Sequence, residues 1–244
     1  MDIIRFWDVL PERAREGLLR AGTNVMIKPG GFLAREHTRA APVFVLRSGA
    51  AKVWVERDGE TVILDVLGPG DIVGELEAVD GGVRDASVEA LTAVQALVLP
   101  ADRFRAVLDA HPGSSWAVAA VLAERLRDAN TLRTAHFPDE PRRRLAGRLR
   151  RLVARFGQPL PGGLGHAVQV PVSQQDLGRW AGMGRRKVAQ ILAAEGGRVT
   201  VARNMITVRS AEALRRLSDD PEPAVVEPFA PRPHLHDARE RVAP

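Results

Sequence analysis

The stretch SQQDLGRWAGMGRRKVAQIL, residues 173–192, predicts two short helices joined by a tight turn. Leu177 and Ala181 would form the apolar face of the first helix, and Gly178 provides a small residue where a second helix must approach closely. Gly182 suits the left-handed turn between the helices. The second helix has its own apolar face, made by Val188, Ile191 and Leu192. This pattern is typical of a helix-turn-helix.

Once that apolar face is buried, the polar side chains at the start of the second helix must be exposed. In the DNA major groove, arginine can donate two hydrogen bonds to guanine and glutamine can read adenine. Ser173 is placed to cap the first helix and to donate to a DNA phosphate. Residues 196–208 predict a two-stranded wing with Arg203 at its tip. The DNA-binding residues expected from this pattern are Ser173, Arg185, Arg186, Lys187, Gln190 and Arg203.

Basic residues are concentrated around this motif. Residues 137–218 hold 16 Arg and Lys against 5 Asp and Glu, a net charge of +11. The first 136 residues and the last 26 each carry a net charge of −3. A basic block behind a mildly acidic domain indicates that one part of the chain binds a polyanion. The alternative is a helical hairpin with a solvated Arg-rich face, and the wing together with the charge makes it less favourable.

The N-terminal part has a different pattern. Residues 1–22 predict a short pair of amphipathic helices, and residues 24–100 consist of short β-type runs separated by turn signals such as RDGE and GPGD. Such runs predict a small antiparallel barrel or sandwich. A further short helix should end at His111, because Pro112 disfavours helix in the residue before it.

A long helix is expected from Gly113 to about His136, and its apolar residues recur at helical spacing as Val118, Leu122, Leu126, Ala129 and Leu132. The stripe fits packing within the chain or the seam of a two-fold dimer, and we expect the dimer. Residues 142–156 predict a basic helix and residues 157–166 a loop. Residues 219–244 include six prolines and predict a disordered tail.

Several classes of protein are disfavoured. The chain has no cysteine, which excludes disulfides, a thiolate nucleophile and a cysteine-ligated iron–sulfur cluster. It lacks a signal-peptide core and a membrane-spanning stretch, so we expect a cytoplasmic protein without membrane contact. No metal site is expected, and no P-loop, HExxH, GxSxG or GxGxxG motif suggests an enzyme. The acids Asp71, Glu75 and Glu77 could form an acid–base set, but acids beside glycines in turns are usually solvated.

Two further motifs precede the long helix: GPGDIVGEL, residues 68–76, and VRDASVEALT, residues 83–92. Together with residues 173–192, in this order, they resemble the Crp/Fnr family, the cyclic-AMP-receptor-like bacterial transcription regulators. The resemblance runs from about Val9 to Val208. Family members that read the cyclic-AMP-receptor half-site have a Glu where this chain has Arg186, so a different target sequence is expected.

The resemblance implies an α+β protein that binds double-stranded DNA as a homodimer in the bacterial cytoplasm and contacts RNA polymerase. Its expected parts are a cyclic-nucleotide-binding-like β jelly roll (1–110), a long dimerisation helix (111–136), a winged helix-turn-helix domain (137–218) and the tail (219–244).

The upstream motifs look like the family's phosphate-binding cassette, in which Glu75 would take the ribose hydroxyl and Arg84 the cyclic phosphate of cAMP or cGMP. Asp85 replaces the family's Ser or Thr; it should repel a phosphate and could engage Arg84. The adenine-reading pair falls on Ala129 and Asn130, so one hydroxyl donor is missing. The candidate nucleotide-binding residues are Gly74, Glu75, Leu76, Arg84, Asp85, Ala86 and Asn130.

An equally favoured alternative is that Glu75 and Arg84 form an ion pair that holds the cassette shut. No cofactor is therefore certain. We expect weak affinity for a cyclic nucleotide at most, and DNA binding that does not require cyclic AMP.

Overall fold

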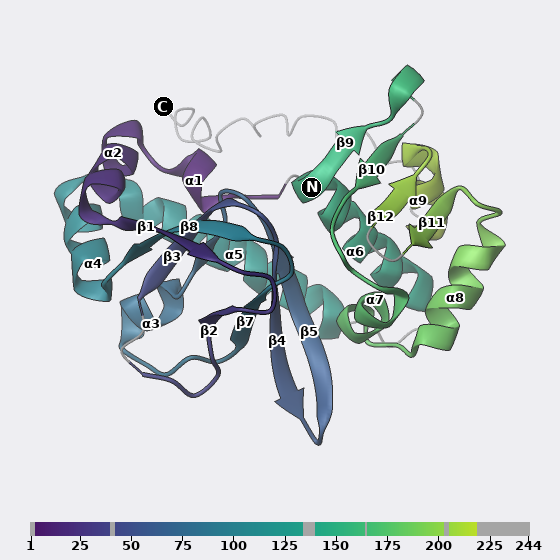
Figure 1. Ribbon diagram of the computed structural model, residues 1–244, viewed down its shortest axis with the longest axis horizontal. Helices are drawn as coiled ribbons and strands as arrows, with labels where there is room; N and C mark the ends of the chain where they lie inside the picture. Colours follow the sequence, from purple (N-terminus) through teal and green to yellow (C-terminus); the bar gives the residue numbers. More distant parts are fainter. Residues whose placement is uncertain (1–2, 40–41, 134–139, 164, 203–204, 219–244) are drawn as a thin grey trace, which may run out of the picture.

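The N-terminal part of the protein is a β jelly roll made of two four-stranded antiparallel sheets (Figure 1). The computed structural model describes residues 3–39, 42–133, 140–163, 165–202 and 205–218. One sheet has the order β1-β8-β3-β6 and the other β2-β7-β4-β5. The strands are β1 (Thr23–Ile27), β2 (Phe32–Ala34), β3 (Val43–Ser48), β4 (Ala51–Arg57), β5 (Glu60–Leu67), β6 (Ile72–Val73), β7 (Ser87–Ala90) and β8 (Val94–Leu99). The predicted small antiparallel β domain is confirmed.

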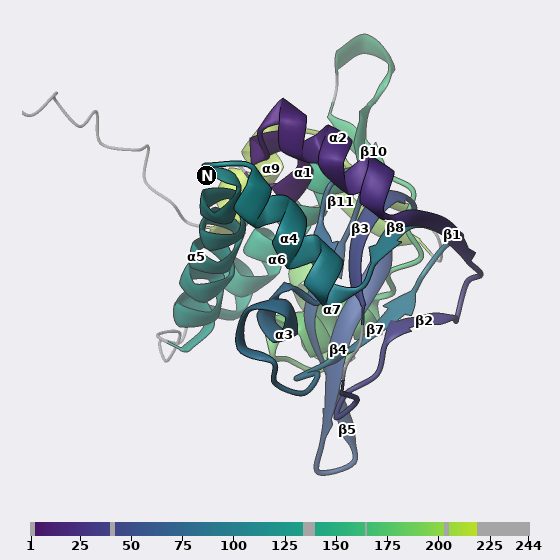
Figure 2. The same ribbon diagram turned by 90° about the vertical axis from the view of Figure 1, so that its left-hand side faces the viewer.

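Helices cover one sheet of the jelly roll and connect it to the C-terminal part (Figure 2). They are α1 (Phe6–Val9), α2 (Glu12–Ala21), α3 (Glu75–Asp80), α4 (Ala101–Ala110) and α5 (Ser114–Arg133). Phe6 and Phe104 pack with their ring centroids 6.0 Å apart in the core beneath these helices. The helix pair predicted for the N-terminus is present as α1 and α2.

The C-terminal part is a winged helix-turn-helix. Its helices are α6 (Glu140–Phe156), α7 (Gln174–Ala181), α8 (Arg185–Ala194) and α9 (Ala211–Ser218), with a single 3-10 turn, η1 (Pro161–Gly163). Its strands are β9 (Gly157–Pro159), β10 (His166–Val168), β11 (Val199–Ala202) and β12 (Met205–Val208), which pair in the order β11-β12-β10-β9.

The expectation of a plain loop over residues 157–166 is wrong, because both its ends are strands. β9 and β10 are only three residues long, and glycine and proline are frequent in and between them. Their sequence therefore looks like a turn. They become strands because β10 pairs with β12, some forty residues later in the chain. Helix α9, which packs against α6, was not predicted either.

The winged part and the jelly roll share a hydrophobic core. Ile63 and Val66 of β5 pack in the same buried cluster as Leu177 and Trp180 of α7. The indole Nε1 of Trp180 also donates a hydrogen bond to the backbone oxygen of Leu64, at 2.9 Å. As a result α7 lies directly beside the β4–β5 hairpin, whereas α8 lies at the far edge of the molecule (Figure 1).

Three arginines on one face of α6 reinforce this docking. Arg148 bonds both carboxylate oxygens of Asp128 on α5, at 2.9 and 2.7 Å. Arg151 and Arg155 converge on Asp65 of β5, each with one nitrogen 3.0 Å from a carboxylate oxygen. The spacing of three and four residues places all three guanidinium groups on the side of α6 that faces the jelly roll and α5.

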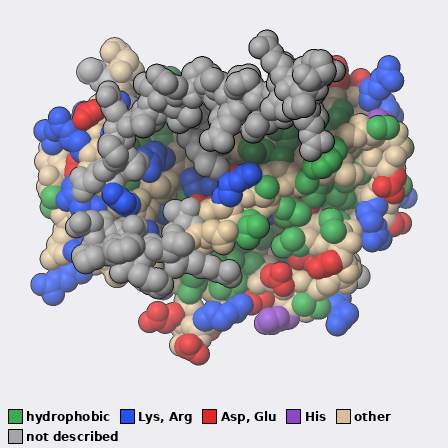
Figure 3. All heavy atoms as spheres, turned by 180° about the vertical axis from the view of Figure 1, so that it is seen from behind, with side chains coloured by type: hydrophobic (Ala, Val, Ile, Leu, Met, Phe, Trp, Pro, Cys, Tyr) green, Lys and Arg blue, Asp and Glu red, His purple; other side chains and the backbone are tan. Residues whose placement is uncertain are grey.

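The exposed apolar face of α5 differs from the predicted stripe. Val118 is buried in the core of its own chain, and Leu122 packs against the same core. Trp116 and Leu126 are 77 % and 59 % exposed instead. Helix α5, which carries them, lies at the back of the molecule (Figure 2), and hydrophobic side chains gather on that face (Figure 3). The stripe therefore divides between an internal face and a free face, because a helix packed on its own domain must bury part of its apolar surface there.

Candidate nucleic-acid interface and cassette pocket

The first helix of the helix-turn-helix, α7, begins with a capping box. Ser173 Oγ accepts a hydrogen bond from the backbone N–H of Asp176 at 3.1 Å, and the Asp176 carboxylate accepts one from the backbone N–H of Ser173 at 2.9 Å. The predicted cap is confirmed. The Ser173 hydroxyl also donates to the Asp176 carboxylate, at 2.6 Å, so in this arrangement its proton is committed within the chain.

The turn between the two helices has the geometry that its glycines suggest. A Cβ on Gly178 would lie 2.5 Å from the backbone oxygen of Met183, closer than any real contact, so only glycine fits there. Gly182 has φ +65° and ends α7 in the left-handed conformation. Arg144 of α6 donates from Nε to the Ala181 oxygen at 2.7 Å, which places a cation at the negative end of α7.

The second helix, α8, exposes the predicted base-reading residues. Its buried face consists of Val188, Ile191 and Leu192, as the spacing predicted. The side chains of Arg185, Arg186, Lys187 and Gln190 are exposed, and none has a hydrogen-bond or ion-pair partner in the part of the chain that the structure describes.

A hollow of about 260 Å³ lies between the start of α7, the start of α8 and the wing. It is lined by Ser173, Gln174, Gln175, Arg185, Val201 and Ala202. Backbone N–H groups at the first turn of a helix and a free guanidinium are both donors to anions. This hollow therefore has the chemistry to receive a phosphate group. Arg203, expected at the tip of the wing, lies outside the described residues.

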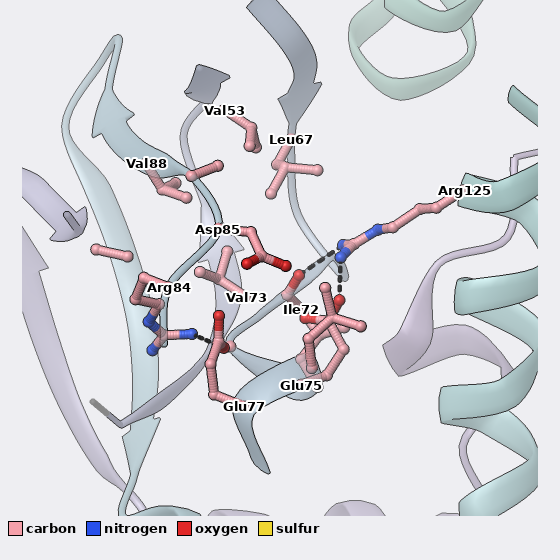
Figure 4. A pocket seen from close by; sticks show the side chains of 14 residues that line it. Val53, Leu67, Ile72, Val73, Glu75, Glu77, Arg84, Asp85, Val88 and Arg125 are labelled. Carbon is pink, nitrogen blue, oxygen red and sulfur yellow. Dashed lines mark hydrogen bonds and ion pairs between the residues drawn. The ribbon is translucent and has the colours of Figure 1, made fainter. Parts of the chain in front are cut away.

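The cassette residues surround a small pocket in the jelly roll (Figure 4). Six of the seven candidate nucleotide-binding residues line it: Gly74, Glu75, Leu76, Arg84, Asp85 and Ala86. Asn130, the seventh, is exposed on α5 and is not part of the lining. Val53, Leu67, Val73 and Val88 form an apolar floor. The pocket leaves about 80 Å³ of free volume, whereas typical small-molecule pockets hold roughly 300 Å³ or more.

The alternative of an ion pair between Glu75 and Arg84 is wrong, because each group has another partner (Figure 4). Glu75 is almost fully buried and pairs with Arg125 of α5, which also donates to the Ile72 oxygen at 2.7 Å. Arg84 pairs with Glu77. Asp85 is exposed and does not engage Arg84 either. The cassette is neutralised internally, as expected, but by two ion pairs between other residues.

The acids of this region were expected to be solvated, and that expectation is also wrong. Asp71 and Glu75 are buried and Glu77 is nearly so, each beside an arginine. Nothing in the local sequence identifies Arg125 as the partner of Glu75, since the two are 50 residues apart. Among the described residues, no group of histidines and acids is arranged to hold a metal ion.

Comparison with known proteins identifies relatives of this chain. Residues 25–111 match the family model of the cyclic nucleotide-binding domain. The CRP-like cAMP-activated global transcriptional regulator of Mycobacterium tuberculosis is 31% identical over 178 residues, which cover 71% of this chain and 78% of that protein. The cyclic AMP receptor protein of Thermus thermophilus is 29% identical over 179 residues, 72% of this chain and 79% of that protein.

The fold is also that of solved regulators. The structure of FixK2 from Bradyrhizobium japonicum superposes with a TM-score of 0.66 at 20% identity, over 80% of this chain and 96% of that one. Within the described segments, no helix combines the length and apolar character needed to cross a membrane. The helix-turn-helix, the cassette and these relatives together show that the chain belongs to the Crp/Fnr family of DNA-binding transcription regulators.

Proposed function

We propose that this protein is a homodimeric transcription regulator that reads a palindromic DNA site through α8. The observation that carries the proposal is the row of exposed donors at the start of α8, which have no partner among the described residues and lie beside the anion-accepting hollow. Arg185, Arg186 and Gln190 would contact base edges, while Lys187, Ser173 and Arg203 would lie along the phosphates. A two-fold dimer would place two such helices about one turn of DNA apart.

The dimer would form along α5. Trp116 and Leu126 expose large apolar side chains on a helix that is already packed on its own domain, and a two-fold dimer along this helix would cover them. Residues 1–110 would then act as the sensor, 111–136 as the dimerisation helix and 137–218 as the DNA-binding domain. The proposed tail, residues 219–244, lies outside the described residues.

Two further partners are proposed from the family. RNA polymerase is the expected protein partner of the DNA-bound dimer. A cyclic nucleotide, cAMP or cGMP, is the candidate effector class, because residues 25–111 match the domain that binds such ligands. As arranged in this chain, the pocket does not accommodate one, since its volume is small and its arginine is already paired.

Selection of bound sequences from random duplex DNA tests the proposal. We expect a two-fold symmetric site, and Arg186→Ala should lose about 1–3 kcal/mol of binding free energy and relax the preference at one base pair of each half-site. Arg13→Ala, which removes an exposed arginine from α2, is the matched control and should change neither. If Arg186→Ala weakens binding equally on every sequence, then Arg186 contacts phosphate and the base-reading role is wrong.

A further inference from the structure

We propose that Glu77 is a built-in substitute for the ligand's phosphate and decides whether this cassette accepts a cyclic nucleotide. The inference goes beyond DNA recognition and does not depend on α8. Glu77 lies one residue beyond Leu76, on the short helix α3, and its carboxylate contacts the guanidinium of Arg84 (Figure 4).

The Arg84–Glu77 pair is held inside the protein. The side chains of Arg84 and Glu77 are only 3 % and 11 % exposed, so solvent does little to screen their attraction. The second terminal nitrogen of Arg84 donates to the backbone oxygen of Pro42. The guanidinium therefore has two acceptors from its own chain, in the place where the family's ligand phosphate would supply them.

The position of the guanidinium also closes the pocket. A Cβ added to Gly74 would collide with both terminal nitrogens of Arg84, so the guanidinium lies directly against the backbone at the start of the cassette. The free volume of about 80 Å³ is what remains beside the paired groups.

Glu77 does not satisfy Arg84 completely. The Nε of Arg84 is buried without a hydrogen-bond partner among the residues that the structure describes. A phosphate offers several acceptor oxygens and can bond a guanidinium at two nitrogens. Removing the Glu77 charge should therefore leave a buried cation with unused donors, which is a receptive site for an anionic ligand.

Asp85 has a different and lesser part. It lines the same pocket but is exposed and makes no contact with Arg84. Its charge opposes an incoming phosphate through partly solvated space, where screening is strong. Glu77, in contrast, must be displaced from its partner before a phosphate can bind.

Calorimetric titration of cAMP into the full-length protein tests the inference. We expect little or no binding to the wild type, and Glu77→Gln should bind about 10- to 100-fold more tightly, the range given by charge-assisted hydrogen bonds. Glu89→Gln is the matched control. It makes the same change in a glutamate that is paired with Lys52 outside the pocket, and it should leave cAMP binding unchanged.

Two more variants identify the cause. The double variant with Arg84→Gln and Glu77→Gln should lose the gain in cAMP affinity. Asp85→Ser alone should give a much smaller gain in cAMP affinity. If Glu77→Gln unfolds at a lower temperature than the wild type, Glu77→Ser is tested as the second variant. It also removes the charge, and its smaller side chain leaves room in the pocket. The inference is overturned if the wild type already binds cAMP as tightly as Glu77→Gln, or if Asp85→Ser gives the whole gain while Glu77 remains. DNA binding is measured separately, so its failure would not alter this result.

Discussion

Asp65 on β5 connects the jelly roll to the winged part through ion pairs with Arg151 and Arg155 of α6. Burial by itself would raise the pKa of the Asp65 carboxyl, but attraction to Arg155 and Arg151 outweighs burial and holds the pKa well below its usual range. A carboxyl whose pKa is lowered by folding stabilises the folded state above its unfolded pKa, near 3.9. That contribution is lost as the pH falls through the lower, folded value.

The stability of the protein should therefore fall in acid partly through Asp65. Asp65→Asn should lower the free energy of unfolding at pH 7 by about 3 kcal/mol, because it leaves two buried guanidinium groups short of a partner. The difference from the wild type should shrink as the pH falls below about 4, because the unfolded wild type then binds a proton at Asp65 that the folded protein does not. Urea unfolding of both proteins from pH 3 to 7 measures this.

Asp71 provides the control for that pH dependence. Burial is the largest influence on its carboxyl and raises the pKa, although Arg155 lies 2.8 Å away and opposes the effect. Lowering the pH should therefore protonate the Asp71 carboxyl and remove the cost of burying its charge. Asp71→Asn should leave the acid-induced fall in stability in place. If Asp65→Asn retains the full acid dependence of the wild type, Asp65 is not its source.

At the scale of elements, α5 has two faces with different roles. Changing Trp116 and Leu126 together to Asp should place charges on the free face and give monomers that remain folded, with much weaker affinity for a palindromic site. Leu122→Ala should instead lower the free energy of unfolding by about 2 kcal/mol, since Leu122 packs against the core of its own chain. Analytical ultracentrifugation should show monomers for the double Asp variant, whereas the effect of Leu122→Ala should appear in denaturant unfolding. A wild type that is monomeric at micromolar concentration would contradict the dimer.

Elements with a strong local pattern were predictable. The helix-turn-helix was found because its apolar spacing, Ser173 cap and Gly182 turn all lie within about twenty residues. Strands β9 and β10 and the division of the α5 stripe were missed, because each depends on a partner far away in the chain. The same limit applied to the cassette. Its residues were identified from sequence, but the choice of Glu77 for Arg84 and of Arg125 for Glu75 is made by packing.

At the scale of the whole molecule, the two parts are not independent bodies. Nothing in the sequence predicts a contact between Trp180 and the jelly roll. In the folded chain its indole bonds the backbone of Leu64, and Ile63 and Val66 complete the core around it. The orientation of α8 is therefore set by β5. Strand β4, which pairs with β5, contributes Val53 to the cassette pocket.

The paired arginines of α6 have a consequence for how binding to DNA responds to salt. Each phosphate that a protein neutralises releases counterions and adds about −0.9 to the slope of log K against log salt concentration. Arg148 and Arg151 are basic but already neutralised by Asp128 and Asp65, so they release none. Lys187→Ala should make the slope shallower by about 1 if Lys187 neutralises one phosphate, whereas Arg148→Gln should leave the slope unchanged. Titrations from low to high salt would measure both slopes, and an equal change in both would mean that α6 exchanges its acidic partners for DNA.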